Sequence, residues 1–121
     1  DIRTNNDRPY IIARGGDNVI SLAQEFEMMP WQFYKYNDMK REDEIKKGQI
    51  VYLKPKRNKA ASGNETHVVQ DGESLWDISQ LYGVKIKSLK SKNNISDAKS
   101  ISQGDTIYLR SSKDGGFLGI F

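Results

Sequence analysis

The chain has 121 residues, of which 36% are apolar and 29% are charged, with a net charge of +3 and a mean hydropathy of -0.72. No apolar run approaches the roughly 20 residues that a transmembrane helix needs, so we expect no membrane-spanning segment here. The absence of cysteine excludes disulfides, thiolate nucleophiles and cysteine-containing zinc sites, and a single histidine excludes the usual two-histidine metal clusters. We therefore expect no cofactor.

The chain begins without methionine and without the basic and apolar regions of a secretory signal, so we expect it to be a piece of a longer protein. Its excess of positive charge lies mostly in residues 55–66, whose proline, glycine, alanine and polar content is typical of a linker. A duplex-binding domain usually concentrates basic charge on one folded face. This distribution therefore favours no nucleic-acid partner.

An internal repeat at an offset of 56 residues organises the chain. Residues 11–54 align without gaps on residues 67–110. Identical pairs in this register include Gly16 with Gly72, Gln24 with Gln80, Asn37 with Asn93, Gly48 with Gly104, and Tyr52 with Tyr108. The repeat predicts a flexible head (1–9), a first copy (10–54), a linker (55–66), a second copy (67–110) and a glycine-rich tail (111–121).

Each copy opens and closes with a short run of β-forming residues. These runs are residues 10–13 and 50–53 in the first copy, and residues 67–70 and 106–109 in the second. Between them, apolar residues at i, i+3, i+4 and i+7 from Val19 and from Leu75 predict a two-turn helix. A second helix is expected near 30–37 and near 86–93. The predicted fold class is α+β, with two small modules that each have two antiparallel strands and two helices on one face.

The second copy closely resembles a LysM module. The resemblance rests on Asp71-Gly72-Glu73-Ser74-Leu75-Trp76, on Asn93-Asn94-Ile95, and on Gly104-Asp105-Thr106-Ile107 at the spacing of that family. The first copy is similar more loosely, because Glu27 replaces the usual glycine and Ala13 replaces a larger apolar residue. The chain as a whole resembles a tandem of LysM domains.

The resemblance implies βααβ modules that bind glycans containing N-acetylglucosamine, with peptidoglycan favoured and chitin an alternative. The site would be a shallow groove between the loop after the first strand and the loop after the second helix. In the second copy its residues would be Gly72, Glu73, Ser74, Leu75, Asn94, Ile95, Ser96 and Ile101. In the first copy, the weaker site, they would be Gly16, Asp17, Asn18, Val19, Asp38, Met39, Lys40 and Ile45.

The resemblance further implies a non-catalytic module that anchors a larger bacterial cell-wall protein, such as a peptidoglycan hydrolase, in the periplasmic or extracellular part of the cell envelope. The chemistry is reasonable, since backbone amides can pair the acetamido group while Leu75, Ile95 and Ile101 receive its methyl group. The same three residues could instead be core residues. The glycine, acidic and serine positions could instead serve ordinary turns and helix caps.

Three aromatic residues of the first copy stand where the second copy has lysines. They are Trp31, Tyr34 and Tyr36, aligned with Lys87, Lys90 and Lys92. Because lysines rarely occupy cores, we expect these positions to be exposed and to form an aromatic patch for a protein or glycan partner. The alternative is that the aromatic residues enlarge a small core. An interaction or oligomerisation module is accordingly the second functional hypothesis.

A hydrolytic site is not expected in this chain. Glycosidic hydrolysis needs two carboxylates about 5 to 10 Å apart in one pocket, and Asp17 and Glu73 fall at equivalent turns of different copies. His67 is expected to be a strand-edge residue, and Trp76 is expected to be partly buried at the margin of its helix. Asn37 and Asn93 are expected to close the second helix of each copy.

Overall fold

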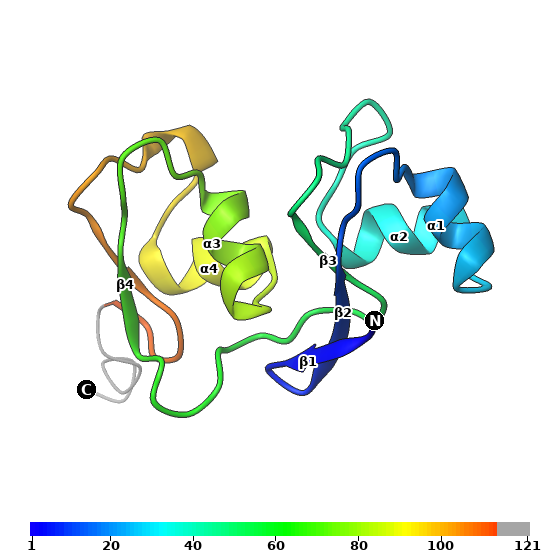
Figure 1. Cartoon of the computed structure of the whole chain (residues 1–121). Helices are drawn as coiled ribbons and strands as arrows, with labels where there is room; N and C mark the ends of the chain where they lie inside the picture. Colours follow the sequence, from blue (N-terminus) through cyan, green and yellow to red (C-terminus); the bar gives the residue numbers. More distant parts are fainter. Residues whose placement is uncertain (114–121) are drawn as a thin grey trace. The chain divides into compact units, whose positions relative to one another are not determined.

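The computed structural model describes residues 1–113 and divides the chain into two compact units, Asp1–Lys56 and Arg57–Phe121 (Figure 1). The glycine-rich tail predicted at 111–121 lies largely outside the described residues. No helix within the described part of the chain is long and apolar enough to cross a bilayer.

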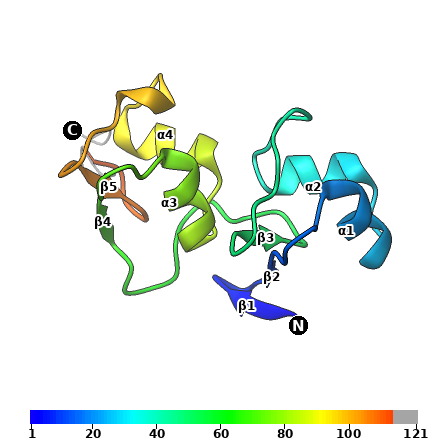
Figure 2. The same cartoon turned by 45° about the horizontal axis from the view of Figure 1, so that its top comes forward.

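The N-terminal unit is a three-stranded antiparallel sheet covered by two helices. Its elements are β1 (Arg3–Asn5), β2 (Arg8–Ile12), α1 (Val19–Glu25), α2 (Pro30–Tyr36) and β3 (Ile50–Tyr52). The strand order is β1-β2-β3, and Ile11 lies opposite Val51. Both views place α1 and α2 on the same side of the sheet (Figures 1 and 2).

The C-terminal unit repeats this plan with two strands. Its elements are β4 (Thr66–Val68), α3 (Leu75–Tyr82), α4 (Ile86–Asn93), the short 3-10 helix η1 (Ala98–Ser100) and β5 (Thr106–Tyr108). The strands β4 and β5 are antiparallel. The predicted α+β class and the order strand, helix, helix, strand are confirmed in both units, whereas η1 had no counterpart in the sequence analysis.

The expected flexible head instead forms part of the sheet. Residues 3–5 form β1, which pairs with β2 through a two-residue turn at Asn6 and Asp7. Both turn residues have positive φ, 53° and 58°, which is the backbone that a tight hairpin requires and that asparagine and aspartate tolerate. Asn5 then donates its side-chain amide to the Tyr52 hydroxyl at 2.9 Å. The N-terminal sheet therefore has three strands rather than the predicted two.

The expected linker is also packed against the units. Arg57 bridges the segment after α3, since its N–H donates to the Gly83 carbonyl and its carbonyl accepts from Lys85, both at 2.9 Å. Ala60 is 1% exposed and belongs to the core of the C-terminal unit. Composition alone predicted a linker here. Backbone hydrogen bonds, side-chain hydrogen bonds from Ser88, Lys92 and Arg110, and the buried Ala60 hold the segment in place.

Each unit has its own apolar core. The N-terminal core is built from Ile11, Ala13, Val19, Leu22, Phe33, Val51 and Leu53, and the C-terminal core from Ala60, Val69, Leu75, Ile78, Val84, Leu89, Ile107 and Leu109. The apolar helix positions that the periodicity indicated therefore face the core. Trp76 is partly buried, as expected.

A buried asparagine fastens the second helix of each unit to its last strand. Asn37 is fully buried, and its side-chain amide donates to the Phe33 and Tyr52 carbonyls at 2.9 and 3.0 Å while its Oδ1 accepts from the Tyr52 N–H at 2.6 Å. Asn93 repeats these contacts with Leu89 and Tyr108. Asn37 thus caps α2 and Asn93 is the last residue of α4, and both side chains satisfy the N–H and carbonyl of a tyrosine at the outer edge of β3 or β5.

Replacing Asn93 with alanine is expected to destabilise the C-terminal unit by about 3 kcal/mol, because the partly buried N–H and carbonyl of Tyr108 and the buried amide contact to Leu89 lose their partner. Thermal unfolding and amide hydrogen exchange at Ile107 measure the effect. Ser91→Ala, an exposed change on the same helix, is the control. Equal losses in the two variants would contradict this role of Asn93.

A buried ion pair closes the end of the N-terminal unit. The Lys56 side chain is 0% exposed, and its Nζ lies 2.7 Å from the carboxylate of Asp38. Burial lowers the pKa of Lys56, and the charge and hydrogen bond of Asp38 offset this in part. Asp38 also has a φ of 51°, in the left-handed region where helix α2 ends. The pair therefore joins the start of the predicted linker to the loop that follows α2.

Asp38→Asn is expected to destabilise the N-terminal unit by about 3 kcal/mol at pH 7, because it leaves the buried ammonium without its counter-charge. Asparagine tolerates the left-handed backbone, so strain is not the cause. The loss should shrink as pH rises through the lowered pKa of Lys56, because the lysine then becomes neutral and needs no counter-charge. Denaturant unfolding measures the loss of stability, and the exposed Glu42→Gln is the control. A loss that is independent of pH would contradict this role of the ion pair.

Candidate functional site

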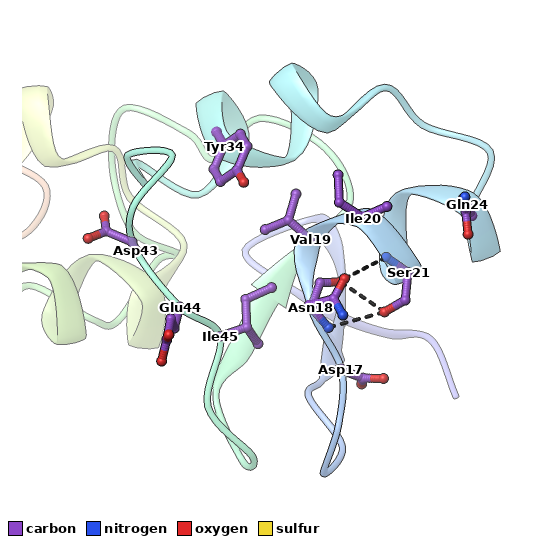
Figure 3. Close-up of a pocket in the computed structure, with 10 residues that line it drawn as sticks. All are labelled: Asp17, Asn18, Val19, Ile20, Ser21, Gln24, Tyr34, Asp43, Glu44 and Ile45. Carbon is purple, nitrogen blue, oxygen red and sulfur yellow. Dashed lines mark hydrogen bonds between the residues drawn. The ribbon is translucent and has the colours of Figure 1, made fainter.

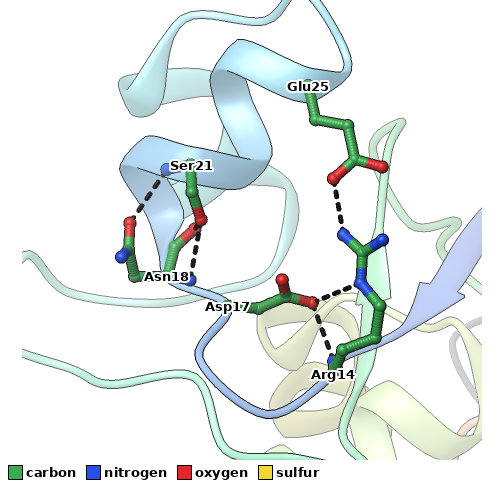
Figure 4. Close-up of polar contacts among 5 residues, drawn as sticks. All are labelled: Arg14, Asp17, Asn18, Ser21 and Glu25. Carbon is green, nitrogen blue, oxygen red and sulfur yellow. Dashed lines mark hydrogen bonds and ion pairs between the residues drawn. The ribbon is translucent and has the colours of Figure 1, made fainter.

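The loop between β2 and α1 is held by an arginine and an aspartate (Figure 4). Asp17 Oδ2 accepts from the Arg14 backbone N–H at 2.7 Å and from Arg14 Nε at 3.0 Å, and Arg14 also pairs with Glu25 on α1. Burial alone would raise the pKa of Asp17, but the hydrogen bonds and charge of Arg14 outweigh it and lower the pKa. Gly16, with a φ of +87°, provides the left-handed residue of this turn.

Helix α1 begins with a reciprocal cap next to this turn (Figure 4). Asn18 Oδ1 accepts from the Ser21 N–H at 2.8 Å, and Ser21 Oγ accepts from the Asn18 N–H at 3.1 Å. The cap satisfies two backbone donors at the start of the helix. Val19, the first helical residue, points into the core and is 5% exposed.

The loop between α2 and β3 is tied to the first loop by backbone hydrogen bonds. The Gly48 N–H donates to the Ala13 carbonyl, and the Ala13 N–H donates to the Gln49 carbonyl, each at 2.8 Å. Asp43 accepts from the Lys40 N–H at 2.8 Å and shapes the outer part of the loop. The two loops that the resemblance singles out therefore lie side by side.

A groove of about 630 Å³ runs between these loops and the two helices (Figure 3). We call it the N-terminal groove; it is lined by Asp17, Asn18, Val19, Ile20, Ser21, Gln24, Tyr34, Asp43, Glu44 and Ile45. Figure 3 shows Val19, Tyr34 and Ile45 converging on the same space from α1, α2 and the second loop. The apolar floor and polar rim suit a ligand that has both apolar and hydrogen-bonding faces.

The N-terminal groove contains half of the residues predicted for the first copy. Asp17, Asn18, Val19 and Ile45 line it. The other four lie outside its lining, since Gly16 forms the turn, Asp38 pairs with Lys56, Met39 packs against the core and Lys40 is exposed. The sequence analysis missed Ile20, Ser21, Gln24, Asp43 and Glu44, although the spacing of Ile20 and Gln24 on α1 places them together on the face away from the core.

The equivalent loop of the C-terminal unit uses different partners. Glu73 Oε1 accepts from the Gln70 N–H at 3.0 Å and lies 2.7 Å from His67 Nε2, while His67 Nδ1 lies 2.8 Å from the Tyr82 hydroxyl. Ser74 caps α3 by accepting from the Asp77 N–H at 3.0 Å. His67 is thus within β4 and bonded on both ring nitrogens, which the expectation of a simple strand-edge residue did not include.

The predicted residues of the second copy are divided among several environments. Leu75 is 1% exposed and belongs to the core, against which Ile95 and Ile101 are packed. Ile95 and Ile101 line a cavity of about 380 Å³ beside η1 and β5. The remaining predicted residues, Gly72, Asn94 and Ser96, are exposed, and Asn94 ends α4 with a φ of 54°.

The predicted aromatic patch is only partly exposed. Trp31 is 57% exposed, as expected, but Tyr34 and Tyr36 are half-buried. Tyr34 packs against the N-terminal core and lines the groove. The expectation that all three would be exposed is therefore wrong, because lysine at position 90 can extend to solvent from a place where a tyrosine ring lies down on the core.

Comparison with known proteins identifies the class of the C-terminal unit. Residues 67–110 match the family model described as LysM domain, so the chain contains a LysM domain at the second copy. This confirms the resemblance there. The assignment of the first copy as a further LysM domain stays a prediction.

The similar proteins are named as an autolysin, an amidase and a spore cortex-lytic enzyme. An autolysin of Enterococcus faecalis is 30% identical over 105 residues, which cover 79% of this chain and 13% of that protein. The N-acetylmuramoyl-L-alanine amidase sle1 of Staphylococcus haemolyticus is 50% identical over 36 residues, 30% of this chain and 11% of that protein. The crystal structure of the Bacillus cereus spore cortex-lytic enzyme SleL matches 86% of this chain and 23% of its own, at 30% identity and a TM-score of 0.36. The chain thus spans less than a quarter of these relatives.

Asn18→Ala is expected to weaken the start of α1 by about 1 kcal/mol, because the helix loses its reciprocal cap. Faster amide exchange at Leu22 and Phe26 would report it. Gln24→Ala, an exposed change on the same helix that removes no cap, is the control. Unchanged amide exchange at these residues in Asn18→Ala would show that the cap does not stabilise helix α1, which borders the groove.

Proposed function

We propose that the chain is a non-catalytic, tandem glycan-binding module in which both units bind N-acetylglucosamine-containing polymers, with peptidoglycan the preferred polymer and chitin the alternative. The LysM domain at residues 67–110 and the similarity to an autolysin and an amidase support a cell-wall ligand. The N-terminal groove is the observation that extends the proposal to the first copy. It lies between the β2–α1 loop and the α2–β3 loop.

The lining of the N-terminal groove fits an uncharged N-acetyl sugar. Val19, Tyr34 and Ile45 offer apolar surface to the acetyl methyl group and to the face of the ring. Asn18, Gln24 and the acidic rim residues offer hydrogen-bond donors and acceptors for hydroxyl and amide groups. A groove of this size and openness at the surface suits part of a polymer, which can continue beyond both ends.

Two such units on one chain bind a polymer with avidity. Each site is expected to be weak alone, and the second binding event occurs at high effective concentration once the first unit is bound. This arrangement supports anchoring of a larger protein, such as a peptidoglycan hydrolase, at the cell envelope in an extracellular or periplasmic position. The names of the similar proteins favour that parent class.

A second function is supported by one exposed aromatic residue. Trp31 is 57% exposed, and the neighbouring Met29 is 59% exposed. Large apolar side chains at the surface favour a contact with a protein partner or with another domain of the parent. In that case Trp31 would be the anchor residue, and the glycan groove would act independently.

Ile20→Lys tests the groove directly, because Ile20 lines it and is 54% exposed, so the change does not disturb the core. Loss of this apolar contact is expected to weaken binding of a chain of N-acetylglucosamine residues by about fivefold. Amide shift titration of the whole chain with N-acetylglucosamine oligomers and soluble peptidoglycan fragments measures both units separately.

Met29→Lys is the matched control, since Met29 is equally exposed, lies outside the groove lining and aligns with Lys85 of the second copy. It should leave glycan affinity unchanged. Absence of amide shifts in both units with either ligand would overturn the glycan proposal and leave the interaction module as the better account.

A further inference from the structure

The two units hold equivalent turns with different basic side chains. In the N-terminal unit, Arg14 binds the carboxylate of Asp17 through its backbone and its guanidinium. In the C-terminal unit, the carboxylate at the equivalent position, Glu73, binds the backbone of Gln70, the residue aligned with Arg14, and the imidazole of His67. A guanidinium is charged at every physiological pH, whereas an imidazole changes its charge between about pH 5 and 8.

The imidazole of His67 is largely buried and has a partner at each ring nitrogen. The side chains of His67 and Glu73 are 12% and 16% exposed. Tyr82 of α3 covers the ring edge-on, with centroids 5.3 Å apart, and its hydroxyl meets Nδ1 at 2.8 Å. Across the sheet, the neighbour of His67 on β5 is the apolar Ile107. The charged group that faces the ring from these elements is therefore Glu73.

Both protonation states of the ring can keep these two contacts. In the neutral ring Nε2–H can donate to Glu73 while Nδ1 accepts from Tyr82, and in the charged ring both nitrogens donate. The difference lies in electrostatics, because the charged ring adds a Coulomb attraction to the ionised carboxylate of Glu73 that the neutral ring lacks. Deprotonation therefore loosens the turn without breaking it.

The turn that Glu73 holds is part of the proposed glycan site. The Glu73 N–H donates to the Gln70 carbonyl at 3.1 Å, and Gly72 between them has a φ of +75°. The turn leads directly into Ser74, which caps α3. The strength of the His67 contact thus sets how firmly the backbone of this loop is held.

We propose that His67 and Arg14 are the positioning residues of the two glycan loops, and that His67 makes the affinity of the C-terminal unit dependent on pH while Arg14 keeps that of the N-terminal unit constant. This inference rests on the proposed glycan function of both loops. The C-terminal loop binds best where the imidazole is charged and Glu73 is ionised, and it binds more weakly where the imidazole is neutral.

At low pH, protonation of Glu73 limits the contact between His67 and Glu73. Burial alone would raise the pKa of Glu73, but the Gln70 N–H, the hydrogen bond from His67 and its charge outweigh burial and lower the pKa. A lowered carboxylate pKa means that the contact is present at neutral pH and is lost as pH falls through that lowered value. Tyr82 stays a neutral hydroxyl across the window, since burial and the charge of Glu73 raise its pKa.

The first test follows the free protein and needs no ligand. His67 is the single histidine of the sequence, so its ring protons report its charge directly. Between pH 5.5 and 8.5 at constant ionic strength, the amides of residues 70–75 should shift with the midpoint of the imidazole, while those of residues 14–19 should not. His67→Gln should abolish the transition. A flat response in wild type, or a transition that persists in His67→Gln, would overturn the proposal.

The second test measures affinity in each unit with an N-acetylglucosamine oligomer. Binding at residues 70–75 should be about threefold weaker at pH 8.5 than at pH 5.5, and binding at residues 14–19 should be constant. His67→Gln should be weak at both pH values. The double variant His67→Ile with Gln70→Arg, which reproduces the Ile11 and Arg14 pair of the first copy, should be strong at both.

The outcomes separate this inference from the function on which it rests. If no oligomer binds at any pH, the glycan function fails, and the amide titration of the free protein still decides whether His67 positions the turn. If the oligomer binds and its affinity in the C-terminal unit is independent of pH, the glycan function stands and the role of His67 is overturned. A double variant as weak as His67→Gln also overturns it.

Discussion

The side-chain amide of one asparagine in each unit is the interaction on which the fold depends. Small modules without disulfides have few ways to close a sheet edge, and Asn37 and Asn93 do so by pairing with the N–H and carbonyl of a tyrosine in the last strand. The same amide donates to a carbonyl of the second helix. One side chain therefore fixes the distance between helix and sheet, and with it the place where the loop after that helix begins.

That fixed frame explains how the copies can share a fold and differ at their surfaces. The loops on either side of the groove meet through paired backbone bonds, Ala13 with residues 48 and 49 in one unit and Val69 with residues 104 and 105 in the other. Side chains around this frame are free to change. Tyr34 lies on the core where the second copy has Lys90, and Arg14 stands where it has Gln70. The proposed differences in binding follow from such changes on a shared order of strands and helices.

The sequence predicted the parts of the fold that repeat and missed the parts that occur once. The offset of 56 residues and the spacing of Val19 and Leu75 located four helices and the four principal strands, because both copies carry the same apolar pattern. Strand β1 was missed since its signal is the pair Asn6 and Asp7, whose left-handed backbone became evident only from the structure. The packing of residues 57–60 depends on backbone bonds and on side-chain bonds from distant residues, which composition does not reveal. At the site, the two loops could be named from the sequence. Asp43 and Glu44 could not, because they reach the groove through an irregular loop whose course the spacing of residues does not predict.

The central claim is that the acetyl group of an N-acetyl sugar enters the space between the two loops of each unit. Intermolecular nuclear Overhauser effects between the acetyl methyl protons of an N-acetylglucosamine oligomer and the labelled chain test it most directly. The account predicts contacts to Val19, Tyr34 and Ile45 in the N-terminal groove, and to Ile95 and Ile101 in the C-terminal unit. Acetyl contacts that fall instead on Trp31 and Met29, or none in the presence of saturating oligomer, would contradict it.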